Sequence, residues 1–228
     1  MGFLKSLLGS APKVSEPVVR RDPNEPRFPV DRVFTGSAAL EVRTIGSLVL
    51  PTGRVVACDP LVFPETVPFS RAVPPGEYPV EVSISIQPNG DERIAAARVR
   101  FREGTPARWE HAVTGGQLVD KLGADELFGY GVDAGTGCFM DEATGALLIA
   151  AMEALPPEQN YYEHVLLPLM EPVSRPTRDW ASHQPDPARR ENVVVFSSGW
   201  GDGCYSSWWA LDAAGEALAL VTDFDVLD

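Results

Sequence analysis

The sequence has few cysteines, few basic side chains and no long apolar run, and each shortage argues against a class of protein. Its cysteines, Cys58, Cys138 and Cys204, are an odd and sparse set of three in 228 residues. Such a count does not fit the disulfide framework of a small secreted domain. No apolar run approaches the roughly 20 residues that cross a bilayer. We therefore expect a cytoplasmic protein.

The shortage of basic residues gives the chain a strongly negative charge. Lys and Arg number 19 and Asp and Glu number 32, for a net charge of −13. A field of this sign repels phosphate backbones and anionic lipid headgroups. We therefore expect neither nucleic acid nor a membrane as a partner. An acidic surface steers instead toward a protein partner with a basic surface.

The rest of the composition is that of an ordinary globular protein, with 44% hydrophobic and 22% charged residues. Five prolines fall between residues 11 and 29, and proline fixes φ and removes a hydrogen-bond donor. We expect residues 1–35 to form an N-terminal tail or strap, followed by a single β-rich domain over residues 36–228.

Alternation of apolar and polar residues is clearest between residues 78 and 101. Val80, Val82 and Ile84 alternate with polar residues, as do Ala97 and Val99. This period of two predicts two strands with one buried face each, and Asn-Gly at 89–90 predicts the tight turn between them.

Other segments give weaker predictions. We expect a strand over 38–50 with a turn near Gly46, and a central strand over 193–196. Helices are predicted over 117–127 and 143–155. The proline-rich segments 60–79 and 168–187 are predicted to be loops, and Asp-Ala-Ala-Gly at 212–215 is expected to join 204–211 to 217–224 in a second hairpin. No βαβ rhythm occurs, so the fold class is α+β, dominated by antiparallel β-sheet (sandwich-like), with one or two short helices.

Two glycine-rich segments, 129–141 and 197–209, resemble each other. Each places Asp and several Gly just before a Gly-Cys-aromatic sequence. Glycine lets the backbone approach a ligand closely, and successive N–H groups can form an anion-binding concavity. The candidate ligand-binding residues are Asp133, Gly135, Gly137, Cys138, Asp141, Trp200, Gly201, Asp202, Gly203, Cys204 and Tyr205.

These residue types allow several kinds of chemistry. If Asp133 and Asp202 converge, they could bind a hard cation or act as an acid/base pair. Cys138 or Cys204 could act as a nucleophile, although none of the three histidines lies in a partner motif. The structural alternative is that the loops are tight turns, the cysteines small buried hydrophobes and the aromatic residues core. The spacing matches no phosphate, dinucleotide or calcium loop, and no cofactor or small-molecule ligand is identified.

Three segments together resemble a known bacterial family. They are Tyr-Pro-Val-Glu-Val-Ser-Ile at 78–84, Gly-Val-Asp-Ala-Gly-Thr-Gly-Cys-Phe-Met-Asp at 131–141, and Ser-Gly-Trp-Gly-Asp-Gly-Cys-Tyr at 198–205 with Thr-Asp-Phe at 222–224. The family is the domain-of-unknown-function family 4241, and the resemblance runs from about Gly53 to the C-terminus. It implies a bacterial origin but no activity and no catalytic residue. Ser206-Ser207 departs from the proline-containing pair expected there.

Three hypotheses about function follow. The first is a non-catalytic binding module, of an immunity-type or regulatory kind, because no catalytic constellation is complete. The alternative is a hydrolase whose pocket is formed by the two loops, with Asp133 and Asp202 as metal ligands. In the third, both loops are structural corners and function lies in segment 60–79.

Overall fold

The structure is a computed structural model, and it describes residues 17–19, 34–35, 38–123 and 126–227. The predicted tail or strap over 1–35 therefore lies outside the described residues, apart from two short strands. The description of side chains begins at residue 39.

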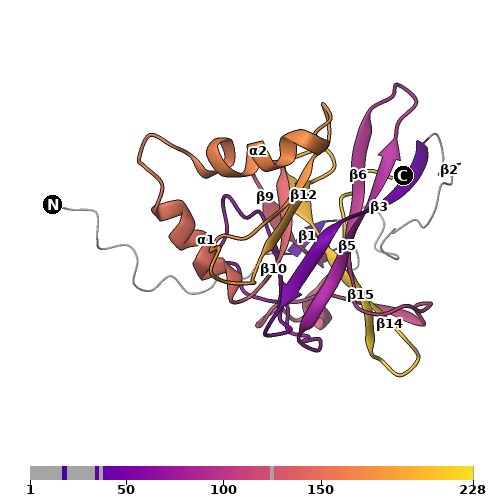
Figure 1. Cartoon of the computed structure of the whole chain (residues 1–228). Coiled ribbons are helices and arrows are strands. Elements are labelled where there is room, and N and C mark those ends of the chain that lie inside the picture. Colours follow the sequence, from indigo (N-terminus) through magenta and orange to yellow (C-terminus); the bar gives the residue numbers. More distant parts are fainter. Residues whose placement is uncertain (1–16, 20–33, 36–37, 124–125, 228) are drawn as a thin grey trace.

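The described chain is built in three layers (Figure 1). A seven-stranded sheet packs against a four-stranded sheet, and the helices cover the other side of the four-stranded sheet. Every strand pair is antiparallel. The predicted α+β fold, dominated by antiparallel sheet with few helices, is confirmed.

Two sheets and two ribbons contain the strands. The seven-stranded sheet runs in the order β2 (Phe34–Thr35), β3 (Ala38–Leu50), β5 (Gly76–Ile86), β6 (Glu92–Arg100), β15 (Ala217–Asp223), β14 (Ser207–Leu211) and β7 (Arg108–His111). The four-stranded sheet runs in the order β11 (Trp180–His183), β12 (Val193–Ser197), β10 (Thr136–Asp141) and β4 (Val55–Cys58). The two-stranded ribbons are β1 (Pro17–Val19) with β8 (Glu126–Phe128), and β9 (Tyr130–Val132) with β13 (Gly203–Tyr205).

The helical elements are short. They are α1 (Thr144–Glu153), the π-helix η2 (Tyr162–Leu166), α2 (Leu167–Met170) and the 3₁₀ turns η1 (Val119–Lys121) and η3 (Glu171–Val173). The helix predicted over 143–155 is confirmed as α1. Among the described residues, no helix combines the length and the apolar character needed to span a bilayer.

The hairpin predicted over 78–101 is confirmed as β5 and β6, and Gly90 in its turn has φ of 91°. The prediction of one buried face was wrong, because Ser83 and Ser85, which lie on the face opposite Val82 and Ile84, are also buried. Glu81, on the same face, is buried and accepts a hydrogen bond from Nε of Arg98 at 2.6 Å. These two residues stand directly opposite each other across the strands, so the cross-strand ion pair compensates the buried carboxylate.

Four local predictions need correction. Segment 38–50 is one continuous strand, and Gly46 marks a shift in its register with β5 rather than a turn. Segment 117–127 is not a helix but the 3₁₀ turn η1 followed by strand β8. Segment 168–187 is not only loop, since it contains most of α2, η3 and strand β11. In the second hairpin, β14 and β15 pair as expected, but Cys204 and Tyr205 belong to β13 and pair with β9.

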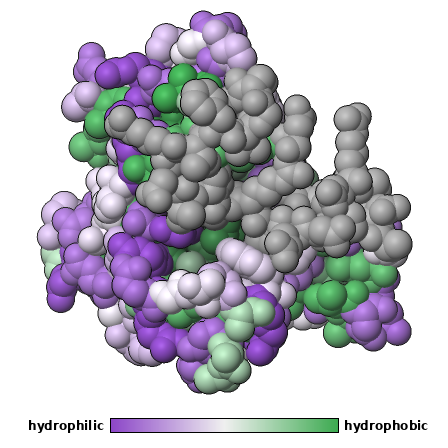
Figure 2. Space-filling model, turned by 90° about the vertical axis from the view of Figure 1, so that its right-hand side faces the viewer, coloured by the Kyte–Doolittle hydropathy of each residue, from purple (hydrophilic) through white to green (hydrophobic). Residues whose placement is uncertain are grey.

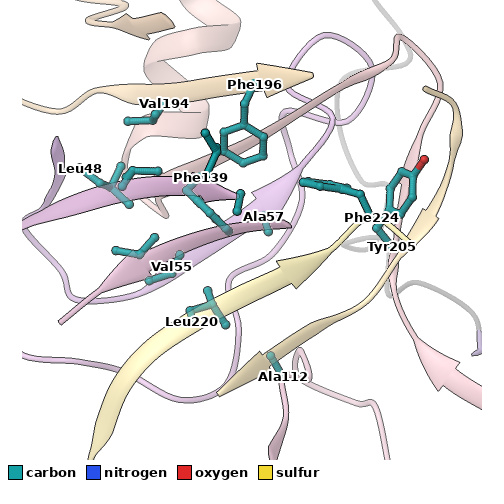
Figure 3. Close-up of a cluster of buried hydrophobic side chains, with 14 of the residues drawn as sticks. Leu48, Val55, Ala57, Ala112, Phe139, Val194, Phe196, Tyr205, Leu220 and Phe224 are labelled. Carbon is teal, nitrogen blue, oxygen red and sulfur yellow. The ribbon is translucent and has the colours of Figure 1, made fainter. Parts of the chain in front are cut away.

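The predicted central strand 193–196 is confirmed as β12, which lies between β11 and β10. Its side chains alternate between two cores. Val194 and Phe196 face the seven-stranded sheet and pack with Phe139 of β10, whereas Val193 and Val195 face the helices. Figure 3 shows Phe139 and Phe196 together in the cluster between the sheets. A four-stranded sheet buried on both faces explains why this segment is continuously apolar.

The surface exposes few large hydrophobic side chains. Figure 2 shows one face, on which hydrophilic residues predominate among the coloured residues and hydrophobic residues form separate patches. Among the described residues, the large hydrophobic side chains that stay exposed are Val62, Leu118, Val119, Leu167, Leu169 and Trp200. Trp200 is the most exposed of these, at 56%.

Candidate functional site

The two glycine-rich loops meet, because paired strands bracket each of them. Loop 1 is residues 133–135, between β9 and β10, and loop 2 is residues 198–202, between β12 and β13. Strand β10 pairs with β12, and β9 pairs with β13. Both strands that enter or leave loop 1 therefore pair with a strand that enters or leaves loop 2. We call the surface that they form together the paired-loop surface.

Hydrogen bonds join the two loops directly. The Ser198 N–H donates to the Gly135 carbonyl at 3.1 Å, and the Gly135 N–H donates to Oδ1 of Asp202 at 3.0 Å. Glycine permits the close approach of the flanking ribbon, because a Cβ on Gly129 would lie 2.8 Å from the Tyr205 carbonyl oxygen. The loops thus form one structural unit from segments that are distant in sequence.

Loop 1 is held by the buried carboxylate of Asp59, a residue that is not among the predicted site residues. Asp59 follows β4 and is fully buried. Its Oδ2 accepts the N–H groups of Asp133 at 3.0 Å and Ala134 at 2.7 Å, and its Oδ1 accepts the N–H of Leu61 at 3.0 Å. The one sequence signal for this role is a polar residue placed directly after the apolar run of β4.

Loop 2 is held from inside by an aromatic residue. The Tyr205 hydroxyl donates to the Gly201 carbonyl at 2.8 Å, and the Ser198 hydroxyl donates to the same carbonyl at 2.9 Å. The Tyr205 ring packs edge-on against Phe224 with 5.0 Å between ring centroids, as Figure 3 shows. Burial, together with the carboxylates of Asp225 and Asp202, raises the pKa of Tyr205 to about 12. The hydroxyl therefore stays protonated and serves as a structural donor.

The two loop aspartates are both exposed but differ in their roles. The Asp202 carboxylate already binds the Gly135 N–H. The Asp133 side chain makes no hydrogen bond or ion pair with the part of the chain that the structure describes, although its own N–H is held by Asp59. Neither belongs to a group of three or more His, Cys, Asp or Glu that could hold a metal ion, since the described residues contain no such group.

Three of the candidate residues lie away from the paired-loop surface. Asp141 is fully buried at the opposite end of β10, where it accepts the N–H and hydroxyl of Thr52 and the N–H of Ala143. Gly137 and Cys138 are buried within β10. Asp141 therefore fixes the entry to α1, and these positions supply no group to the surface.

The cysteines are poorly placed to act as nucleophiles. Cys138 is fully buried and its sulfur contacts that of Cys58. Cys204 lies at the edge of the surface, where burial raises the pKa of its thiol. The histidines bond to other groups: His111 to the Phe128 carbonyl, His164 to the Asn160 carbonyl and His183 to the Tyr161 hydroxyl.

Trp200 and Gly201 of loop 2 belong to the surface, as does Gly203, the first residue of β13. The Trp200 ring stacks beneath the Arg93 guanidinium, whose carbon lies 4.8 Å from the ring centroid. Arg93 also donates to the Gly199 carbonyl at 3.3 Å. The arginine, which the sequence analysis did not select, therefore holds an exposed aromatic side chain in place. By contrast, Trp208, Trp209 and Tyr205 are buried, as the core interpretation expected.

Three exposed aspartates lie on the two loops or on the segment that packs beside loop 2. Asp202 follows Trp200 by two residues, and Gly201 beside it lies against Gly135 of loop 1, next to the exposed Asp133 and Ala134. On the other side, a Cβ built on Gly199 would lie 2.8 Å from Phe224 and Val226, which flank the exposed Asp225. The surface therefore combines an exposed aromatic side chain with exposed aspartates on the two loops and on the segment beside Gly199.

A β-rich α+β fold with two paired glycine loops is the class that these observations define. Within that class, the chain belongs to the family described as protein of unknown function (DUF4241), whose model matches residues 48–222. The match spans the four-stranded sheet and both loops. No curated protein and no solved structure gives a significant match.

Proposed function

We propose that the protein is a non-catalytic binding module that docks a basic protein partner on the paired-loop surface. The observation that carries this proposal is Trp200, which is 56% exposed and stacked on Arg93 at a junction where two loops are locked together. Tryptophan and arginine are the residue types most enriched at the energetic centres of protein interfaces.

The negative charge of the chain supports the choice of a basic partner. Asp133 and Asp202 are exposed on the two loops and Asp225 is exposed on the segment beside Gly199, and the whole chain carries a net charge of −13. Complementary charge accelerates encounter and suppresses wrong partners. A partner segment that presents Arg or Lys beside an apolar side chain matches this surface. A regulatory or immunity-type role in a bacterial cytoplasm is the setting we propose for it.

The rigidity of the surface also supports binding. The loop backbone is held by Asp59, Asp202 and Tyr205, and the tryptophan by Arg93. A surface that is ordered before binding avoids the free-energy cost of ordering side chains on association. Separately, no described thiol is both accessible and paired with a base, so the geometry favours binding over hydrolysis.

A displayed library of random peptides, selected on the full-length protein at low salt, tests this proposal. We expect enriched peptides to be rich in Arg and Lys and to lose affinity by at least about 30-fold on Trp200→Ala, which corresponds to about 2 kcal/mol. Leu118→Ala is the matched control, because Leu118 is similarly exposed at 55% and is not part of the paired-loop surface. Enrichment of peptides without basic residues, or equal affinity for the Trp200→Ala variant, would overturn the proposal.

Asp133→Asn separates charge from structure, because the Asp133 carboxylate holds no described group in place. We expect this variant to bind the selected peptides with a slower association rate and a weaker dependence on salt, since a rim charge acts mainly on encounter. Surface plasmon resonance at two salt concentrations measures both effects. An unchanged association rate would contradict the charge-based choice of partner.

A further inference from the structure

Two cysteines stand side by side beneath the helices. Cys58 of β4 and Cys138 of β10 are directly opposite each other in an antiparallel pair, and their sulfurs lie 3.6 Å apart. They are 1% and 0% exposed. Both side chains lie on the helix-covered face of the four-stranded sheet, where they belong to a buried cluster with Met140 of β10 and Leu148 of α1. The alternation of β4 and β10 places both sulfurs on this face and brings them into contact.

This arrangement is close to that of a disulfide bond. Directly opposed residues of an antiparallel pair have Cβ atoms about 4.5–5.5 Å apart, and a disulfide requires about 3.5–4.5 Å. A small approach of the two strands is sufficient. Among the described residues, the two thiols belong to no group of three or more His, Cys, Asp or Glu that could hold a metal ion.

We propose that Cys58 and Cys138 are a redox modification site that forms a reversible cross-strand disulfide. The oxidant is a low-molecular-weight disulfide of the oxidised glutathione class. One cysteine loses its proton, and its thiolate attacks a sulfur of the reagent, forming a mixed disulfide and releasing one small thiolate that takes up a proton. The second cysteine, as a thiolate, displaces the remaining half. The protein loses two electrons and two protons, and the reagent becomes two thiols.

The folded protein protects this pair from rapid oxidation. The hydrogen bond with Cys138 and burial both raise the pKa of the Cys58 thiol well above its ordinary value, and thiols react as thiolates. Strand β4 offers a route to exposure, because it has four residues and lies at the edge of its sheet. Local opening of this edge strand exposes both sulfurs, so the rate of oxidation follows the rate or extent of opening.

The disulfide also affects loop 1. Asp59, which holds the N–H groups of Asp133 and Ala134, is the next residue after Cys58. Cys138 follows Gly135 by three residues. A bond between the two sulfurs therefore fixes the strand end that carries the loop-holding carboxylate. This inference does not depend on the proposed binding function.

The test is disulfide mapping of the full-length protein after equilibration with oxidised and reduced glutathione at a urea concentration just below the unfolding midpoint. Remaining thiols are alkylated, and the digest is analysed by mass spectrometry. We expect a single cross-linked peptide pair that joins Cys58 to Cys138, with Cys204 alkylated, and full reversal by dithiothreitol. The oxidised protein should show a higher urea midpoint and slower amide exchange at Asp133 and Ala134.

Two variants serve as controls. Cys204→Ser should leave the cross-link unchanged. Cys138→Ser should stop the reaction at a glutathione adduct on Cys58, and the wild-type map decides the outcome even if this variant does not fold. Alkylation of all three cysteines after equilibration, or cross-links that involve Cys204, would overturn the proposal. Neither outcome bears on peptide binding, so failure here is distinguishable from failure of the proposed function.

Discussion

Asp59 gives the sharpest test of how the paired-loop surface is built. Its carboxylate is fully buried and accepts three backbone N–H groups, those of Leu61, Asp133 and Ala134. In Asp59→Asn one oxygen becomes an NH₂ group, which cannot accept. If the remaining oxygen keeps the two loop N–H groups, the NH₂ faces the N–H of Leu61, and both donors are left unsatisfied.

The magnitude follows from these contacts. A hydrogen bond to a charged group contributes about 1.5–3 kcal/mol, and a buried group without a partner costs about 1–3 kcal/mol. We therefore expect Asp59→Asn to lower the free energy of unfolding by about 2–4 kcal/mol. Asp202→Asn is the control, because its carboxylate is exposed and holds the single N–H of Gly135, so its loss should be about 1 kcal/mol or less.

Urea unfolding, followed by tryptophan fluorescence, measures the free energy of unfolding of both variants. The slope of that free energy against urea concentration should be unchanged. Amide hydrogen exchange locates the effect, since the N–H groups of Asp133 and Ala134 should lose protection in Asp59→Asn. A change below about 0.5 kcal/mol in Asp59→Asn, within the usual range of surface substitutions, would refute the assignment of Asp59 as the support of loop 1. Unchanged exchange at both amides would refute it as well.

Three further outcomes are expected. Gly53→Ala should be strongly destabilising, because its Cβ would lie 1.9 Å from the Val73 carbonyl oxygen. Gly90→Ala has a similarly positive φ but open space around its Cβ, so it should lower the free energy of unfolding by only about 1 kcal/mol. Thermal unfolding of both variants checks this. Phe139→Ala, in the centre of the core, should lower the free energy of unfolding by about 3–5 kcal/mol in urea titrations. A hydrogen bond from Arg189 is the chief cause that lowers the pKa of Glu191 to about 2. The stabilisation by Glu191 is therefore present above its ordinary pKa of 4.5 and is lost as the pH falls toward 2. Unfolding curves recorded over that pH interval should show that Glu191→Gln loses less stability than the unsubstituted protein.

Local chemistry accounts for what the sequence could predict about the fold. Asn89-Gly90 and the alternating strands around it specified a hairpin, because a tight turn and a period of two are properties of short segments. The apolar run of β12 indicated a central strand for the same reason. These features depend on neighbouring residues, so they can be recognised without knowledge of the rest of the chain.

Errors arose where tertiary contacts decide the outcome. Segment 117–127 has a helix-compatible composition, but its end forms strand β8, which pairs with β1 from the far N-terminal part of the chain. Ser83 and Ser85 imply an exposed face, yet they are buried. Pairing partners and the covering of a sheet depend on distant residues, and a local pattern contains no information about them.

The candidate site was predictable in part. Resemblance between the two loops predicted that they could form one site, and the structure places the loops together. It could not indicate that Asp59 and Arg93 support them, because both lie far away in sequence and belong to no motif. Nor could the resemblance show that Asp141 lies apart from the loops. Asp141 belongs to the same glycine-rich segment as Asp133 but lies at the other end of β10.

The interlocking of the two loops has a consequence for how relatives of this protein can vary. Loop 1 and loop 2 are bounded on both sides by paired strands, and the Ser198–Gly135 hydrogen bond closes the space between them. An insertion in one loop alone would separate these backbones and leave their N–H and carbonyl groups without partners. Sequences in the family should therefore lengthen or shorten both loops together, so that a joint change in loop length identifies family members with a reshaped surface.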